Sequence, residues 1–178
     1  KPKKQKKSNS NTDYEPSSPT FDVSCFVAGS KIKLSSGKNI NIEDLVVGDI
    51  VLSYNVNTNI FEESSIENVT INYKDNLVIY NFDNGIKITC TDTHPIWVVG
   101  KGWSSYRQTD VNDSEHIGLT KQISTGDECF YYSNNKFNKV KISKIIEKQN
   151  KMVRVWNVKN VTGNHNFIIN NVLVHNVT

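Results

Sequence analysis

The sequence lacks long apolar runs, and its N-terminus lacks the apolar segment of a signal peptide. No apolar stretch among the 178 residues reaches the roughly 18 residues that a membrane-spanning helix needs. The first residues are instead basic and polar. We therefore expect neither a membrane span nor a membrane partner, and these features leave the localisation open.

Cysteine is scarce as well. Cys25, Cys90 and Cys129 make an odd number, and no two of them form a CxxC pair. This pattern argues against a disulfide framework and against a structural zinc module. A thiol with a chemical role would favour a reducing compartment such as the cytoplasm.

Outside the N-terminal segment, acidic and basic residues nearly balance. Residues 1–24 hold five lysines and three acidic residues, a net charge of +2 out of +3 for the whole chain. The near-neutral remainder argues against a nucleic-acid-binding face, so no nucleic-acid partner is expected. Residues 1–20 have the composition of a disordered basic linker, and we expect one ordered domain over residues 21–178.

Helical periodicity is rare, and short apolar segments bounded by turn residues fill the ordered part. A helix is expected only within residues 103–119, and residues 40–45 indicate a short helical or irregular turn. Strands are expected over residues 31–34, 49–54, 66–73, 77–82, 86–90, 96–99, 128–132, 140–146, 153–158, 167–169 and 172–174. The pattern predicts an all-β architecture of many short strands.

A weak internal repeat divides the ordered part in two. Gly48-Asp49 and Gly126-Asp127 each form a turn signal that precedes a strand, and they lie 126 − 48 = 78 residues apart. Gly-Asp turns are common, so the similarity could be accidental. If it is real, the two halves pack back to back and bring the two ends of the ordered chain together.

The last residues combine a hairpin signal with two reactive side chains. Asn170-Asn171 separates two short apolar runs and predicts a two-residue turn, which places His175 and Asn176 at the end of a strand. An asparagine amide can attack its own carbonyl, form a succinimide and break the chain, and a neighbouring histidine can supply the proton. A His-Asn pair alone is weak evidence, because such pairs arise by chance.

Further motifs upstream strengthen this interpretation. The order is a leading cysteine, a T-x-x-H motif, a histidine eleven residues before the final asparagine (176 − 165 = 11), and a terminal His-Asn pair: Cys25, Thr91, His94, His165, His175 and Asn176. This order resembles the Hint superfamily, which includes inteins, bacterial intein-like (BIL type A) domains, pretoxin-type Hint domains and the Hedgehog autoprocessing domain. The resemblance covers residues 25–176 and implies a horseshoe-like all-β fold with pseudo-twofold halves.

The resemblance also implies a role for each motif residue at the N-terminal end. Cys25 would attack the carbonyl of Ser24 in an N-to-S acyl shift and form a thioester. His94 would protonate the leaving nitrogen, and Thr91 would hold the scissile amide or the oxyanion. Taken singly, Cys25 could be a small buried apolar residue and Thr91 an ordinary strand residue.

At the C-terminal end the resemblance implies a second cleavage. Asn176 would cyclise with help from His175 and His165, and the bond to Val177 would break. Three of the four histidines in the chain thus fall on motif positions. The domain would act once, on its own chain, with its flanking polypeptides as partners and with residues 177–178 as a short flank.

Two positions depart from the family pattern. Val177 stands where a splicing intein has Cys, Ser or Thr, so the usual transesterification lacks its nucleophile. We therefore expect cleavage at both ends, or transfer of the upstream segment to an amine or thiol of another protein. Asn157 stands where the family often has Asp, and an amide cannot titrate.

No cofactor is required by this chemistry. Cys25, His94, His165 and His175 would nevertheless make a competent zinc set if the two ends meet, which predicts reversible inhibition by zinc. Two other functions remain open: a degenerate Hint fold that serves as a binding or structural module, and a Hedgehog-like sterol transferase. The Hedgehog family lacks the terminal His-Asn pair that this chain has, so the sterol transferase ranks last.

Overall fold

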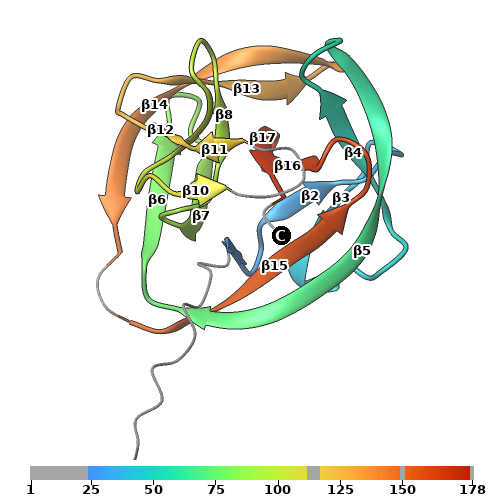
Figure 1. The fold of residues 1–178 in the computed structure, drawn as a ribbon, viewed down its shortest axis with the longest axis horizontal. Helices are drawn as coiled ribbons and strands as arrows, with labels where there is room; N and C mark the ends of the chain where they lie inside the picture. Colours follow the sequence, from blue (N-terminus) through green and yellow to red (C-terminus); the bar gives the residue numbers. More distant parts are fainter. Residues whose placement is uncertain (1–23, 112–116, 149–150, 177–178) are drawn as a thin grey trace, which may run out of the picture.

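The computed structural model describes residues 24–111, 117–148 and 151–176, and they form a single ring of β-strands (Figure 1). The predicted linker, Val177 and His116 lie outside these residues. The strands are β1 Phe26–Val27, β2 Lys31–Lys33, β3 Asn39–Asn41, β4 Ile50–Asn55, β5 Ile60–Lys74, β6 Leu77–Phe82, β7 Lys87–Thr91, β8 Ile96–Val98, β9 Gly102–Ser105, β10 Asp110–Val111, β11 Gly118–Leu119, β12 Lys121–Gln122, β13 Glu128–Ser133, β14 Lys136–Glu147, β15 Val153–Val161, β16 Asn166–Ile169 and β17 Val172–His175. The predicted all-β class is confirmed.

Every predicted strand falls on an observed one, and the predicted irregular turn at 40–45 contains the 3-10 helix Ile42–Asp44. The helix predicted within residues 103–119 is wrong, because the described part of that segment contains most of β9 and all of β10 and β11. Gly102 and Gly118, near the two ends of this segment, have left-handed φ angles of 84° and 72°. In the part of the chain that the structure covers, no helix has the length and apolarity to cross a membrane.

The main sheet has the strand order β3-β2-β16-β17-β8-β13-β14-β6-β7-β1-β15-β5-β4, with β9 and β12 attached beside β8. Its two ends meet, because Leu34 after β2 bridges to Val51 of β4. Asn166 completes the closure: its Oδ1 accepts the N–H of Tyr54 at 2.9 Å, and its Nδ2 donates to the Tyr54 carbonyl at 2.7 Å. One side chain thus takes the place of a strand partner between β16 and β4.

The two halves repeat the same bent-strand design, as the Gly-Asp pair predicts. β5 pairs first with β4 and then with β15, and β14 pairs first with β13 and then with β6. At the change of partner, Gly48 donates its N–H to Ile66 and Gly126 donates its N–H to Ile142. Both glycines have a φ of 94°, which a residue with a side chain adopts only with strain.

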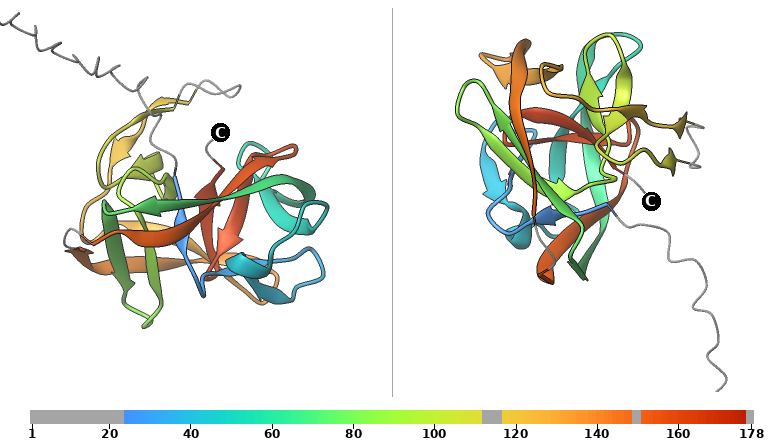
Figure 2. Two further views of the ribbon diagram at one scale, coloured as in Figure 1. Left: turned by 90° about the horizontal axis from the view of Figure 1, so that it is seen from below. Right: turned by 90° about the vertical axis from the view of Figure 1, so that its left-hand side faces the viewer.

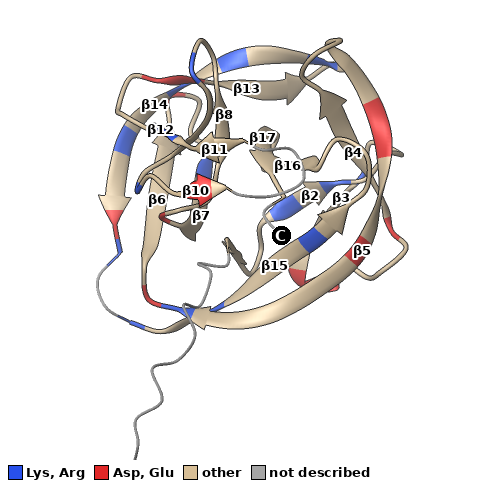
Figure 3. Cartoon of the chain, viewed as in Figure 1, with Lys and Arg blue, Asp and Glu red and all other residues tan. Residues whose placement is uncertain are grey.

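Apolar side chains fill the inside of the ring. The largest fully buried ones include Tyr80, Phe26 and Phe167. Charged side chains lie on the outer strands and loops, whereas β16 and β17 carry no Lys, Arg, Asp or Glu (Figure 3). The last two strands, with every residue buried, are therefore part of the core, and Figure 2 shows them in red among the other strands.

Candidate functional site

The C-terminal hairpin forms as predicted and fixes the end of the described chain. Asn170 and Asn171 have φ angles of 47° and 66°, as a two-residue hairpin turn with both central residues left-handed requires. β16 and β17 then pair in register, with Asn166 opposite His175. The N–H of His175 donates to the carbonyl of Pro95, and β17 also pairs with β8, so the strand that ends in His175 is held on both sides.

Cys25 lies directly before β1, between β7 and β15. Its N–H donates to the hydroxyl of Thr91 at 3.0 Å, and its carbonyl accepts the N–H of Thr91 at the same distance. Cys25, Ser24 and Thr91 are all buried. The nitrogen of the Ser24–Cys25 peptide bond is therefore hydrogen-bonded to Thr91, the threonine of the T-x-x-H motif.

The T-x-x-H segment is a tight loop anchored through its second residue. The N–H of His94 donates to the Thr91 carbonyl, which closes the turn. Asp92 receives two hydrogen bonds from Arg107, at 3.0 and 3.1 Å, and one from the Asn76 amide at 2.9 Å. This anchor fixes the position of both Thr91 and His94, and no sequence motif indicated it.

His94 connects the two ends of the chain. Its Nε2 lies 2.9 Å from the carbonyl oxygen of His175 and must be the donor, because a carbonyl only accepts. The Phe26 ring covers the imidazole at 4.2 Å, and burial lowers the pKa of His94 to about 3. The ring is therefore neutral at pH 7, and its buried Nδ1 has no hydrogen-bond partner within the described residues.

Asn176 is buried with its side-chain amide uncommitted. Its N–H donates to the carbonyl of His165 at 2.8 Å. Neither Nδ2 nor Oδ1 has a partner in the described part of the chain, which costs about 1–3 kcal/mol for each group. His175 packs edge-on against Trp103, with ring centroids 4.8 Å apart.

Asn157 lies beside Cys25. β1 pairs with β15 through Phe26 opposite Trp156, and one further step along this register places Cys25 opposite Asn157. The side chain of Asn157 is buried, and its Nδ2 has no partner within the described residues. The structure thus brings Asn157, Thr91 and Cys25 to one place.

The zinc set expected from the sequence does not form. Among the described residues, no three His, Cys, Asp or Glu side chains are arranged to hold a metal ion. His94 directs Nε2 to a carbonyl, so this nitrogen is not available as a ligand.

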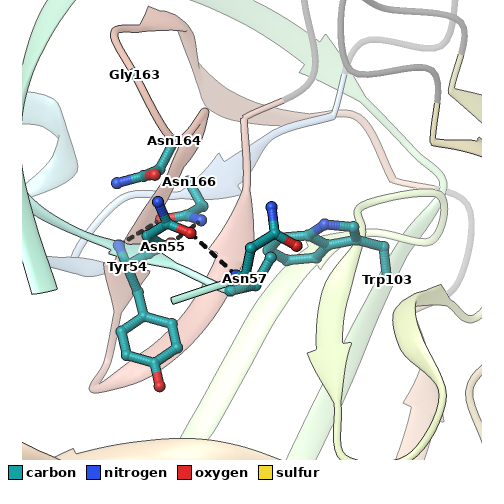
Figure 4. A pocket seen from close by; sticks show the side chains of 8 residues that line it. Tyr54, Asn55, Asn57, Trp103, Gly163, Asn164 and Asn166 are labelled. Atoms are coloured by element: carbon teal, nitrogen blue, oxygen red, sulfur yellow. Dashed lines mark hydrogen bonds between the residues drawn. The ribbon is translucent and has the colours of Figure 1, made fainter. Parts of the chain in front are cut away.

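A polar pocket of about 200 Å³ lies next to the C-terminal residues (Figure 4). It is lined by Tyr54, Asn55, Val56, Asn57, Trp103, Gly163, Asn164 and Asn166. Trp103, which contacts His175, joins the pocket to the terminal site. Nothing in the sequence indicated this pocket, because its asparagines come from two segments that lie far apart in the sequence, residues 55–57 and 164–166.

The segment 26–134 matches the family model of the Ataxin-1 and HBP1 module (AXH). The chain belongs to the AXH family. The AXH match covers more than half of the 178 residues, but it begins one residue after Cys25 and stops before β14. The candidate residues Cys25 and Asn176 therefore lie outside the AXH match. No curated protein matches this AXH chain in sequence.

The fold of the AXH chain is similar to that of inteins. The DnaB intein from Synechocystis sp. PCC 6803 has a TM-score of 0.70 and 22% identity, over 87% of this chain and 99% of that one. The bacterial intein-like domain from Clostridium thermocellum has a TM-score of 0.65 and 25% identity, over 85% of this chain and 98% of that one. The gp41-1 intein has a TM-score of 0.61 and 21% identity, over 86% of this chain and 98% of that one. The predicted Hint/intein fold is confirmed.

Proposed function

We propose that this chain is a single-turnover, self-processing domain of the bacterial intein-like or pretoxin type. It would break its own main chain before Cys25 and after Asn176. The observation that supports this most strongly is that one loop contacts both reacting segments. Thr91 holds the nitrogen of Cys25 at 3.0 Å, and His94 holds the carbonyl of His175 at 2.9 Å. A loop in that position can serve two reactions at opposite ends of the sequence.

At the first site the Cys25 sulfur attacks the carbonyl carbon of Ser24. A C–S bond forms, the C–N bond breaks, and the thiol proton ends on the freed amine of Cys25, so the product is a thioester. Because His94 is neutral and its Nδ1 carries a lone pair, it can take the thiol proton and pass it to the amine. Thr91 holds the amide nitrogen during this transfer.

At the second site the Asn176 amide nitrogen attacks the carbonyl carbon of its own residue. A succinimide forms, the bond to Val177 breaks, and a proton moves from the amide to the leaving amine with His175 as the carrier. The hydrogen bond from His94 fixes the preceding carbonyl, and His165 fixes the N–H of Asn176. These contacts limit the motion of the residue that must close the ring.

The fate of the thioester follows from two residues. Val177 offers no nucleophile, so the acyl group passes to water, or to an amine or thiol of another protein, with hydrolysis or ligation as the result. Asn157 cannot relay a proton between the sites. We therefore expect the two cleavages to proceed independently, with the flanking polypeptides as the substrate.

The test is an intact-mass measurement on the purified chain in dithiothreitol or hydroxylamine. We expect a product without residues 1–24, because dithiothreitol and hydroxylamine both cleave a thioester. We also expect a separate loss of residues 177–178. Cys25→Ala should abolish the first loss, whereas Cys129→Ala, which removes another buried thiol, should retain it. A wild-type chain that keeps its full mass would refute the proposal and favour a structural module.

A further inference from the structure

Asn72, near the end of β5, lies against the sulfur of Cys25 although no sequence motif includes it. Its amide Nδ2 is 3.9 Å from Sγ, within the range of a hydrogen bond to sulfur, and 3.4 Å from the hydroxyl of Thr70. An asparagine amide carries two N–H groups, so one nitrogen can serve both acceptors.

Strand register explains this contact. On β15, Val155 lies opposite Asn72 and Asn157 lies opposite Thr70. Side chains that face each other across a ladder, or that lie two residues apart on one strand, point to the same face of the sheet. Cys25 packs against Val155 on that face. The sulfur is therefore next to both Asn72 and Asn157.

Both of these neighbours of the sulfur, Asn72 and Asn157, are neutral amides. Asn72 presents an N–H to the sulfur, and the Nδ2 of Asn157, buried nearby, has no partner within the described residues. A thiolate accepts hydrogen bonds much more strongly than a thiol, so N–H donors aimed at sulfur favour the ionised form. An amide also keeps its donor at every pH.

From this geometry we infer that Asn72 is a thiolate-stabilising residue of the Cys25 site, which lowers the proton affinity of the sulfur so that it can attack at neutral pH. This inference rests on the proposed acyl shift for its purpose, but the N–H···S contact acts on the thiol whether or not the chain cleaves. Asn157 adds a second donor when the sulfur becomes charged.

The direct test is the titration of Cys25 in the full chain, followed by the ¹³Cβ chemical shift of labelled cysteine between about pH 6 and 11. Asn72→Ala should raise the midpoint by about one unit, because a donor to the thiolate is lost. Asn72→Asp keeps the shape but presents a carboxylate, which should raise the midpoint further. Asn68→Ala and Asn68→Asp, at an exposed position of the same strand, should leave it unchanged.

Cleavage before Cys25 provides a second readout. Asn72→Ala should slow it about tenfold at pH 7, and the deficit should disappear at a pH where the thiolate forms without help. A midpoint that does not rise in either Asn72 variant overturns the inference, and Asn72→Asp, which is isosteric, carries the test if Asn72→Ala fails to fold. A raised midpoint in a chain that never cleaves would refute the proposed function and leave the inference standing.

Discussion

His94 is the residue that both ends of the chain share, and its protonation state decides what it can do. The ring is buried, covered by Phe26 and bonded to the His175 carbonyl, and burial lowers its pKa to about 3. In the acyl shift that we propose, it would therefore act as a neutral base that already donates one hydrogen bond. A charged imidazole at this position would lack the free lone pair that the thiol proton needs.

Burial of neutral His94 makes the stability of the fold dependent on pH. The folded pKa lies below the value of about 6.5 that the side chain has when unfolded, so the unfolded chain binds the proton first. The contribution of this residue is complete above about pH 6.5 and is lost as the pH falls toward 3. Its full size is several kcal/mol.

We expect His94→Gln to flatten this dependence. Urea unfolding at pH 7.5 and pH 5 should show a smaller loss of unfolding free energy in the variant than in the wild type, because the other three histidines are present in both. Equal losses in the two proteins would show that His94 is not kept neutral by the fold.

The Asp92–Arg107 pair anchors the loop that carries His94, and its removal should affect both proposed cleavages. Arg107→Gln removes the two hydrogen bonds at 3.0 and 3.1 Å that anchor the loop. We expect both cleavages to slow about ten- to a hundredfold, because small displacements of a catalytic group have large effects on rate. Lys101→Gln, which breaks a comparable ion pair with Asp127, should change neither rate. An effect on one end alone would contradict a shared loop.

At the scale of elements, two hairpins have the same Asn-Asn turn but differ in the hydrogen bonds of the turn side chains. The first residues of the two turns, Asn134 in the β13–β14 hairpin and Asn170 in the β16–β17 hairpin, are both left-handed, with φ of 54° and 47°. Only Asn170 also uses its side chain, which accepts the N–H of Lys31 and donates to the carbonyl of Lys87, both at 2.8 Å. It fastens the C-terminal hairpin to two other strands.

Glycine tolerates the left-handed conformation, so it separates these two contributions. Asn170→Gly should lower the unfolding free energy by about 1–3 kcal/mol, because two side-chain hydrogen bonds are lost. Asn134→Gly should be neutral within about 0.5 kcal/mol. Chemical denaturation of the two variants measures the difference, and equal effects would mean that the Asn170 side chain is not a fastener.

The elements that the sequence failed to predict share a physical cause. The first half of β5 contains Glu62 and Glu63 and is mostly exposed, so it has no apolar alternation, and it is a strand because β4 pairs with it. The Asn170-Asn171 turn, by contrast, is a local preference of the backbone and was predictable. Asn72 could not be found, because a single asparagine on a strand acquires its role only from the register that places it beside Cys25.

At the scale of the whole molecule, closure of the sheet is what makes a single site from two ends. The two bent strands β5 and β14 turn the halves toward each other, and Asn166 joins β16 to β4. The motif order in the sequence predicted a set of candidate residues at the two ends of the chain. It could not predict that the loop ending in His94 lies between them, because that depends on the packing of β1, β7, β8 and β17.

The central claim is that one loop serves both cleavages, and a time course of intact mass for the wild type and His94→Ala tests it most directly. The account predicts that the wild type loses residues 1–24 and residues 177–178, and that His94→Ala slows both losses, since the variant removes the proton carrier at one end and the hydrogen bond to the His175 carbonyl at the other. If His94→Ala cleaved at the C-terminal end as fast as the wild type, the claim of a shared site would be contradicted.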